Sequence, residues 1–301
     1  MIRAGTRRSK LAQFQTALVL QRLTEAANDL ETDTVFQDTR GDLLADRPLP
    51  EIGGKGLFTA ELETALREKR IDIAVHSLKD LPTVDAPGLV IGAVLDREDV
   101  RDALVAGHGR TLDELPSGAV VGTSSNRRTA QLRMMRSDID VRSVRGNVPT
   151  RVEKMRAGQY DAVVLAVAGL ERLGMRDAIT EIFEPGRMLP APGQGALAVQ
   201  CRADDDATRR LLESVEDPDV RAAVTAERAF LGRLEAGCSS PVAAFARVTG
   251  DRIMLQGLVA SLDGKRVIRL EGDGADARAL GIELAEEAFA RGAGEVMRDG
   301  A

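Results

Sequence analysis

The sequence is poor in cysteine, histidine and aromatic residues, and each shortage excludes a class of site. Two Cys and two His are too few for a closed zinc site or a disulfide framework. With no Trp, one Tyr and 3% aromatic residues, little is available for stacking nucleic-acid bases. A formal net charge of −6 and a pI near 5.3 also argue against a nucleic-acid binder. We therefore expect neither a metal nor a nucleic-acid partner.

Long apolar runs are also missing, and none approaches the length needed to span a membrane. Residues 1–10 are basic like the start of a signal peptide, but residues 11–23 carry Gln and Thr at helical spacing, unlike a signal core. We expect a cytoplasmic protein without membrane contact. Lysine is scarce too, with six among 41 basic residues, so arginine dominates. Local arginine clusters are informative because guanidinium groups suit bidentate binding of carboxylates and phosphates.

What is present is an alternation of strand-like and helical patterns, in a chain long enough for two or three domains. It predicts parallel α/β sheets covered by helices, without an internal repeat. The predicted strands are 71–75, 89–94, 119–121 and 161–167, and the predicted helices are 10–27, 58–69, 126–136 and 147–157.

Two breaks suggest domain boundaries: a polar stretch at 95–102 and a Pro/Gly-rich stretch at 188–195. From about residue 217 the pattern changes to a helix at 219–234, strands separated by hairpin signals, and a final helix at 275–297. We predict three domains: an α/β domain of 1–97 with 196–214, a second α/β domain of 98–195, and an α+β domain of 215–301. The irregular, Gly/Pro-rich segment 39–56 reads as a flap.

Cys238 lies in a small-residue loop, RLEAGCSSP, where a thiol is accessible. A general base for thiol catalysis would have to be His76 or His108, and neither neighbourhood resembles a cysteine hydrolase. An arbitrary cysteine is more often a buried core residue. We read Cys201 that way, His76 as a packing or hinge residue at a strand end, and His108 as loop surface.

Four segments carry Ser, Thr, Arg or Lys after strand-like residues, counting two short strand-like stretches at the start of the chain and before Ser143: 6–9, 75–82, 122–128 and 143–151. In open α/β sheets, ligands bind beyond the carboxyl ends of strands, where helix N-termini offer free N–H groups. These side chains would line a cleft for a ligand with many negative charges. The alternative for each segment is a helix cap with solvated arginines. Four such segments in one chain favour the ligand site.

Asp80 follows one of these strands. Such a residue is usually a helix cap or turn residue, and Pro82 would allow a helix to begin at Asp80. Among many cations Asp80 would stay ionised, which suits it to stabilise a developing cation and to handle protons on a leaving amine. The segment Gly53–Gly56 lacks the spacing of a phosphate-binding loop.

Six motifs together resemble the porphobilinogen deaminase, or hydroxymethylbilane synthase, family. They occur in the family's order over nearly the whole chain: HSLKDLP at 76–82, GTSSNRR at 122–128, SVRGNVPTR at 143–151, LAVAGLERLG at 165–174, LPAPGQGALAVQCR at 189–202 and RLEAGCSSP at 233–241.

The resemblance implies two lobes like those of type II periplasmic binding proteins, with a smaller third domain that carries the cysteine loop. It implies a transferase that condenses four porphobilinogen molecules head to tail, loses ammonia at each step, and releases hydroxymethylbilane by hydrolysis. The primer would be a dipyrromethane cofactor in thioether linkage to Cys238, and the enzyme would be a monomer that hands its product to the next tetrapyrrole enzyme.

The resemblance also assigns residues. The catalytic group would be Asp80. Cofactor binding would fall to Lys79, Ser125, Arg127 and Arg128, and substrate binding to Arg7, Ser9, Thr123, Arg145, Arg151 and Gln194. Since every pyrrole unit carries an acetate and a propionate, a set of arginines suits the growing chain, although the protein is acidic overall.

Three positions depart from the family pattern: Ala236 for a frequent Gly, Glu51 for a common basic residue in the flap, and Pro149 for a frequent Gly. Ala236 leaves cofactor attachment credible, Glu51 puts a flap contact in doubt, and Pro149 near a helix start should be tolerated. Two other functions compete with this reading. A non-enzymatic solute-binding protein conflicts with the absent signal peptide, the third domain and Cys238, and a thiol-dependent hydrolase lacks a histidine near Cys238.

Overall fold

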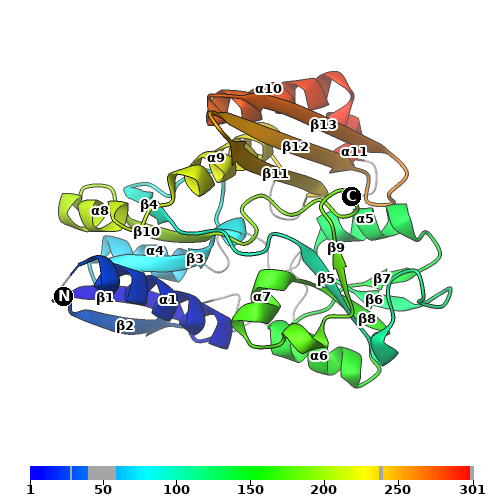
Figure 1. Ribbon diagram of the computed structural model, residues 1–301, viewed down its shortest axis with the longest axis horizontal. Helices are drawn as coiled ribbons and strands as arrows, with labels where there is room; N and C mark the ends of the chain where they lie inside the picture. The colour runs from blue at the N-terminus through cyan, green and yellow to red at the C-terminus, as the bar shows by residue number, and fades with distance from the viewer. Residues whose placement is uncertain (28, 40–58, 237–239, 299–301) are drawn as a thin grey trace. The chain divides into compact units, whose positions relative to one another are not determined.

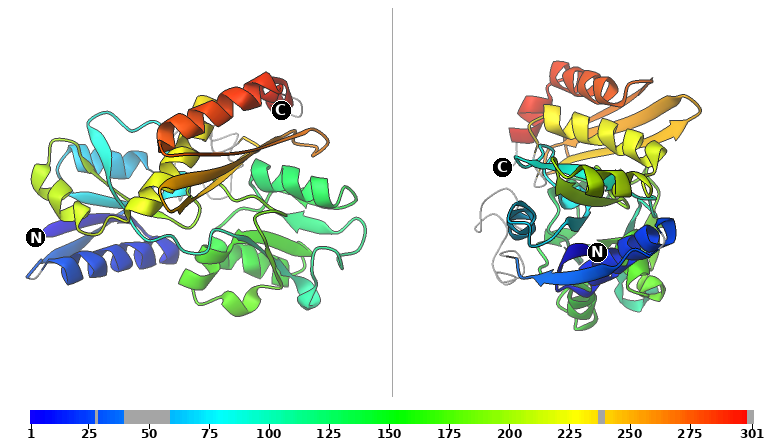
Figure 2. Two further views of the ribbon diagram at one scale, coloured as in Figure 1. Left: turned by 45° about the horizontal axis from the view of Figure 1, so that its top comes forward. Right: turned by 90° about the vertical axis from the view of Figure 1, so that its left-hand side faces the viewer.

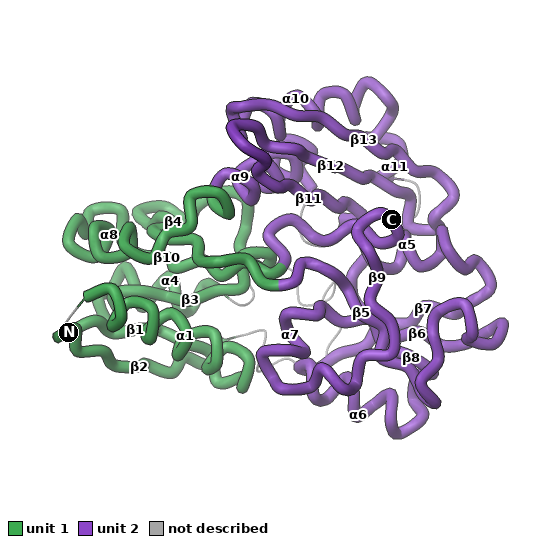
Figure 3. Tube along the Cα trace, viewed as in Figure 1, with its two compact units in different colours: residues 1–98, 195–221 green, residues 99–194, 222–301 purple. Residues whose placement is uncertain are grey.

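The computed structural model describes residues 1–27, 29–39, 59–236 and 240–298. Cys238, Glu51 and the segment Gly53–Gly56 lie outside these residues. The chain forms two compact units, one of residues 1–98 and 195–221 and the other of residues 99–194 and 222–301 (Figure 3).

Unit 1 contains a five-stranded sheet in the order β2-β1-β3-β10-β4 (Figure 1). Strand β1 pairs in parallel with β2 and β3, whereas β10 runs antiparallel to β3 and β4. Helices α1 and α8 pack on one face and α4 packs on the other. The bounds are β1 Ile2–Arg7, α1 Lys10–Ala26, β2 Thr32–Gln37, α4 Ala60–Arg67, β3 Ile73–Ser77, β4 Leu89–Val94, β10 Leu197–Arg202 and α8 Asp206–Glu213.

The first sheet of unit 2 has the order β7-β6-β8-β5-β9. Strand β6 is parallel to β7 and β8, and β5 is antiparallel to β8 and β9. Helix α5 packs on one face, and α6 and α7 pack on the other. The bounds are β5 Asp102–Ala106, β6 Val120–Gly122, α5 Asn126–Met135, β7 Asp140–Arg142, α6 Val148–Arg156, β8 Ala162–Ala166, α7 Val167–Arg172 and β9 Glu181–Phe183.

The two five-stranded sheets share one pattern of parallel and antiparallel pairing, which confirms the predicted pair of α/β lobes. One detail of the prediction was wrong. The sheets are mixed and not parallel, because β10 and β5 enter them antiparallel. A strand buried on both faces is a continuous apolar run whichever way it points, so the sequence did not give its direction. The two sheets thus share one topology without a repeat in the sequence.

The second sheet of unit 2 is antiparallel, in the order β11-β12-β13. Helices α9, α10 and α11 cover one face (Figure 2). On this face Phe230 of α9 lies over Gly257, where an added Cβ would come within 2.8 Å of the ring. The bounds are α9 Pro218–Arg233, β11 Val242–Thr249, β12 Arg252–Ala260, β13 Val267–Gly274, α10 Ala277–Ala290 and α11 Ala293–Arg298.

The opposite face of this sheet contacts α5. Leu258 and Ala260 of β12 pack with Ala130 of α5 and with Leu189. Helix α5 therefore lies between two sheets and is covered on both sides. The predicted boundaries of three domains stay a prediction, because the structure groups these two sheets in one unit.

Most helix ends agree with the sequence pattern to within about two residues, but the predicted helix 275–297 is two helices. Gly292 separates α10 from α11 with φ of +91°, a conformation that glycine adopts without strain. Among the described residues, no helix is long and apolar enough to cross a membrane.

Candidate active site

The turn after β3 presents Asp80 to solvent. Ser77 ends the strand, and Leu78–Asp80 form one turn of 3-10 helix in which Leu78 is buried. Lys79 is half-buried and Asp80 is exposed. The helix that Pro82 would have allowed to begin at Asp80 does not form, because Leu81 is extended, with φ of −79° and ψ of 136°. Leu81 precedes Pro82, and a residue before proline is disfavoured in the helical region.

Polar contacts inside unit 1 fix the strand that leads to Asp80. His76 is buried, and its Nε2 lies 3.2 Å from Oε1 of Gln200 on β10. Burial lowers the pKa of His76 to about 4, so the ring is neutral near neutral pH. Gln15 of α1 donates to Oγ of Ser77 at 2.8 Å. The predicted packing role of His76 is confirmed, and Asp80 is the exposed acid that follows it.

The segment after β1 contains a helix cap and an exposed arginine. Ser9 caps α1, and its Oγ accepts a hydrogen bond from the backbone of Ala12 at 3.3 Å. Arg8 is exposed and pairs with Asp38 at 2.8 Å. Arg7, at the end of β1, is half-buried.

The segment after β6 differs, because its arginines are buried. Ser125 caps α5 by accepting from the backbone of Arg128 at 3.4 Å. Thr123 is buried, and its Oγ1 accepts from the backbone of Ser125 at 3.2 Å. Arg127 is 4% exposed and Arg128 is 6% exposed, so neither is a solvated arginine at a helix end.

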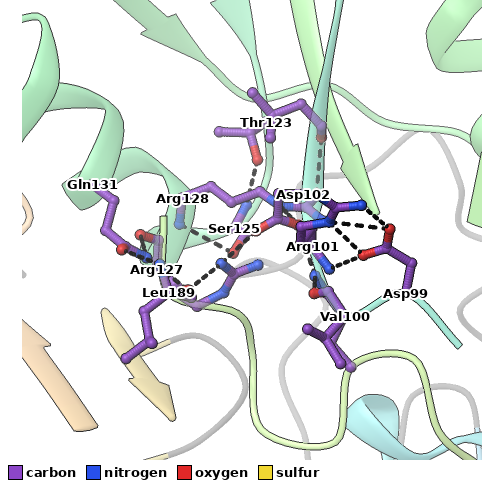
Figure 4. Close-up of polar contacts among 12 residues, drawn as sticks. Asp99, Val100, Arg101, Asp102, Thr123, Ser125, Arg127, Arg128, Gln131 and Leu189 are labelled. Atoms are coloured by element: carbon purple, nitrogen blue, oxygen red, sulfur yellow. Dashed lines mark hydrogen bonds and ion pairs between the residues drawn. The ribbon is translucent and has the colours of Figure 1, made fainter. Parts of the chain in front are cut away.

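Both arginines point to one carboxylate, that of Asp102 at the start of β5 (Figure 4). Arg127 Nη1 donates to Oδ2 of Asp102 at 2.6 Å and to the carbonyl of Leu189 at 2.8 Å. Arg128 donates to Oδ1 of Asp102 from Nη2 at 2.6 Å and from Nε at 3.0 Å, and to the carbonyl of Val164 at 2.9 Å. Sequence reasoning missed Asp102. The available signal was an acidic residue at the head of the apolar run Ala103–Ala106.

Gln194 joins the same cluster. Its Nε2 donates to Oδ1 of Asp102 at 2.9 Å and to the carbonyl of Val100 at 2.7 Å. The preceding Gly193 has φ of +74°, and its N–H donates to the buried carboxylate of Glu227 at 2.7 Å. A positive φ at this position favours glycine, so the PGQG motif is explained by the turn that places Gln194.

The segment after β7 positions two more predicted residues. Asn147 caps α6 by accepting from the backbone of Thr150 at 3.0 Å, and Pro149 sits without strain in the first turn, as expected. Arg151 Nε donates to the carbonyl of Gly146 at 2.8 Å. Arg145 is half-buried, and its Nε is buried without a hydrogen-bond partner among the described residues.

Two family profiles match nearly all of this chain. The profile "Porphobilinogen deaminase, dipyromethane cofactor binding domain" matches residues 2–210, and "Porphobilinogen deaminase, C-terminal domain" matches residues 221–290. The chain belongs to the porphobilinogen deaminase family. It is 50% identical over 289 residues to the porphobilinogen deaminase of Roseiflexus sp. (strain RS-1), covering 96% of this chain and 95% of the relative. It is 47% identical over 298 residues to the porphobilinogen deaminase of Brevibacillus brevis, and the match covers 99% of this chain and 96% of the relative.

Among solved structures, a periplasmic binding protein of Salmonella typhimurium, described as having high arginine specificity, matches at 13% identity. The TM-score is 0.41, with 71% of this chain and 91% of the other covered, and we draw nothing further from it.

Membership in the porphobilinogen deaminase family establishes the activity, hydroxymethylbilane synthesis on a dipyrromethane cofactor for tetrapyrrole biosynthesis. The two competing functions, a solute-binding protein and a thiol-dependent hydrolase, are therefore wrong. Among the described residues, no group of His, Cys, Asp or Glu could hold a metal ion.

The buried cluster fits the cofactor of porphobilinogen deaminase, whose side chains are carboxylates. Arg127, Arg128 and Asp102 together carry one positive charge in excess. Of the five N–H donors on a guanidinium, these bonds use two on Arg127 and three on Arg128. Arg127 Nε is buried without a hydrogen-bond partner among the described residues. Spare donors and an excess positive charge are what a carboxylate ligand requires.

The pKa values agree with a permanently charged cluster. Burial alone would raise the pKa of Asp102, but the charges of Arg127 and Arg128 and their hydrogen bonds hold it far below its usual value. Burial, together with the charge of Arg128, lowers the pKa of Arg127 despite Asp102, which is consistent with an excess of positive charge. An arginine remains protonated at neutral pH even so.

Proposed function

We propose that Cys238 carries the dipyrromethane cofactor through a thioether, that Asp80 is the catalytic acid–base group, and that two sets of residues bind carboxylates. The cofactor set is Lys79, Ser125, Arg127 and Arg128, and the substrate set is Arg7, Ser9, Thr123, Arg145, Arg151 and Gln194. The observation that carries this proposal is the buried pair of arginines, which has more positive charge and more N–H donors than Asp102 satisfies.

Asp80 suits the role because its carboxylate is exposed on a turn that packed residues hold in place. Loss of ammonia from porphobilinogen breaks the bond between the aminomethyl carbon and nitrogen and leaves an electron-poor pyrrole. The Asp80 carboxylate accepts a hydrogen bond from the pyrrole N–H and stabilises the positive charge that develops. It also shares a proton with the departing amine. When bound, the cofactor supplies the pyrrole carbon to which the first substrate unit is joined, so the protein needs no nucleophile at each turnover.

The carboxylate-binding residues hold and orient the acetate and propionate groups. Each contact between a guanidinium and a carboxylate is a charge-assisted hydrogen bond. Arg127 and Arg128 act from a water-poor environment, where such bonds are stronger than at the surface. Ser125 and Thr123 place hydroxyl groups at the start of α5 beside them.

The properties of the other cysteine support Cys238 as the attachment site. Cys201 is fully buried in the core of unit 1, and burial raises the pKa of its thiol to about 11. A thiol with that pKa is almost entirely protonated at neutral pH and is shielded from an electrophile. Cys238, in its small-residue loop, is the remaining thiol.

The test is the intact mass of the purified protein, followed by peptide mapping. We expect an adduct equal to two deaminated porphobilinogen units on the peptide that contains Cys238. Cys238→Ser should lose this mass, and Cys201→Ala should keep it. Alanine is preferred at position 201 because a serine hydroxyl buried there would lack a partner. An active parent enzyme whose Cys238 is unmodified would refute the attachment.

We also propose that the enzyme takes porphobilinogen as a cytoplasmic monomer and passes hydroxymethylbilane to the next enzyme of the pathway. The support is the small-molecule chemistry of the family. Sedimentation equilibrium of the holoenzyme should give the mass of one chain, and a mass of two chains would refute the monomer.

A further inference from the structure

Asp102 is the point at which three predicted binding residues meet. Its two oxygens accept four hydrogen bonds, two from Arg128, one from Arg127 and one from Gln194. The donors come from two separate parts of the sequence, the start of α5 and the 188–195 segment. Asp102 is 0% exposed, so it contacts these residues and no solvent.

The cluster would not hold this arrangement without the carboxylate. Arg127 and Arg128 are consecutive residues whose guanidinium groups are buried side by side, and like charges in a water-poor site repel strongly. Asp102 offsets one of the two charges and uses a different oxygen for each arginine, Oδ2 for Arg127 and Oδ1 for Arg128. It thereby fixes which N–H groups remain for a ligand.

We propose that Asp102 is a positioning residue, which holds Arg127, Arg128 and Gln194 in one fixed arrangement so that the remaining donors of the two arginines recognise carboxylates as a set. This inference rests on the proposed function of those three residues. Asp102 itself touches neither cofactor nor substrate, and it acts only through its partners.

Unit 1 provides a matched control in Asp72, another carboxylate that accepts from two arginines. Its oxygens accept from Arg3 at 2.8 Å and 3.0 Å and from Arg202 at 3.1 Å. Neither arginine is among the predicted binding residues. A substitution of Asp72 therefore disturbs a similar ion cluster in the same protein without touching the proposed binding set.

The experiment compares Asp102→Asn with Asp72→Asn in the full-length protein, both made in cells that supply porphobilinogen. Asparagine keeps the shape and removes the charge, so both variants should lose thermal stability. Only Asp102→Asn should reduce the fraction of chains that carry the cofactor mass, by several-fold. Holoenzyme isolated from that variant should show KM for porphobilinogen raised by about 10- to 100-fold, the size of effect found when a group that orients metal ligands is lost. Its kcat should fall less, because Asp80 is unchanged.

Equal KM and equal cofactor occupancy in the two variants would overturn the inference. Should Asp102→Asn not fold, Asp102→Glu serves instead, since it keeps the charge and displaces it by one methylene. That variant should recover stability yet still raise KM, and parental values of KM and occupancy in it would overturn the inference as well.

Arg128→Leu separates this inference from the proposed function. If Arg128→Leu binds cofactor and substrate normally, the proposed carboxylate binding fails. If Arg128→Leu weakens binding while Asp102→Asn does not, only the positioning role of Asp102 fails.

Discussion

The segments that leave β3 and β6 carry predicted site residues in opposite settings. Asp80, after β3, is an exposed acid on a short turn. Arg127 and Arg128, after β6, are buried cations with a buried counterion. An acid that handles protons gains from access to solvent, whereas cations that bind carboxylates gain from exclusion of water.

The same difference predicts how each segment tolerates substitution. Asp80 is exposed, so its loss should affect turnover alone. Arg127 and Arg128 each neutralise part of a buried carboxylate, so their loss should affect both binding and folding. Measuring turnover, cofactor binding and stability on the same variants tests whether exposed Asp80 affects turnover alone and the buried arginines affect both binding and folding.

The largest expected effect is on turnover in Asp80→Asn. Removing the charge while keeping the shape should reduce kcat by roughly 10²- to 10⁴-fold, the usual range for a lost acid–base or electrostatic group. The thermal unfolding midpoint and the cofactor mass should stay close to the parent's. Steady-state kinetics and intact mass give both results, and a kcat within a few-fold of the parent's would remove Asp80 from the mechanism.

The next effect concerns the arginines. Arg128→Leu and Arg145→Leu should each weaken cofactor or chain binding by about ten- to 150-fold, since a charge-assisted hydrogen bond contributes about 1.5–3 kcal/mol. Both variants should stall at particular numbers of added pyrroles, seen as discrete enzyme–intermediate masses. Normal turnover without such masses would mean that these arginines do not bind carboxylates.

The free energy of unfolding should also differ between Arg128→Leu and Arg145→Leu. Arg128→Leu leaves Asp102 short of a partner and should cost about 3–5 kcal/mol of unfolding free energy. Arg145 has no ion pair among the described residues, so Arg145→Leu should cost about 1 kcal/mol or less. Equal losses of unfolding free energy, measured with denaturant, would show that the two arginines contribute equally to the stability of the fold.

The remaining effect is a pH dependence of stability that comes from His76 and appears only below neutral pH. Its pKa is about 4 in the folded chain against an ordinary value of 6.5, so the unfolded chain binds the proton first as pH falls. The contribution of neutral His76 to the free energy of unfolding is therefore fully present above pH 6.5 and decreases as the pH falls toward 4. Below pH 4 this contribution is lost, and the total loss is about 3 kcal/mol. His76→Gln should lose this contribution. Unfolding of both proteins between pH 7 and 4 tests it, and parallel curves would contradict it.

Much of the fold could be predicted because local patterns decide it. Strand β4 and helices α1 and α5 begin where their patterns predicted. The direction of β5 and β10 could not be predicted from the sequence, because a strand buried on both faces has the same apolar pattern in either orientation. The sequence also left open whether a helix begins at Asp80, and the restriction that Pro82 places on Leu81 decided against it.

The candidate site also has one part that the sequence determined and another that only the tertiary structure decided. The sequence alone determined the family and which residue types stand at the strand ends, because those motifs are contiguous. Only the tertiary structure decided that Arg127 and Arg128 are buried and that Asp102 is their counterion. Twenty-five residues separate Arg127 from Asp102 along the chain. Only the pairing of β5 with β8, and the packing of α5 between two sheets, bring that carboxylate beneath the arginines and exclude water from them.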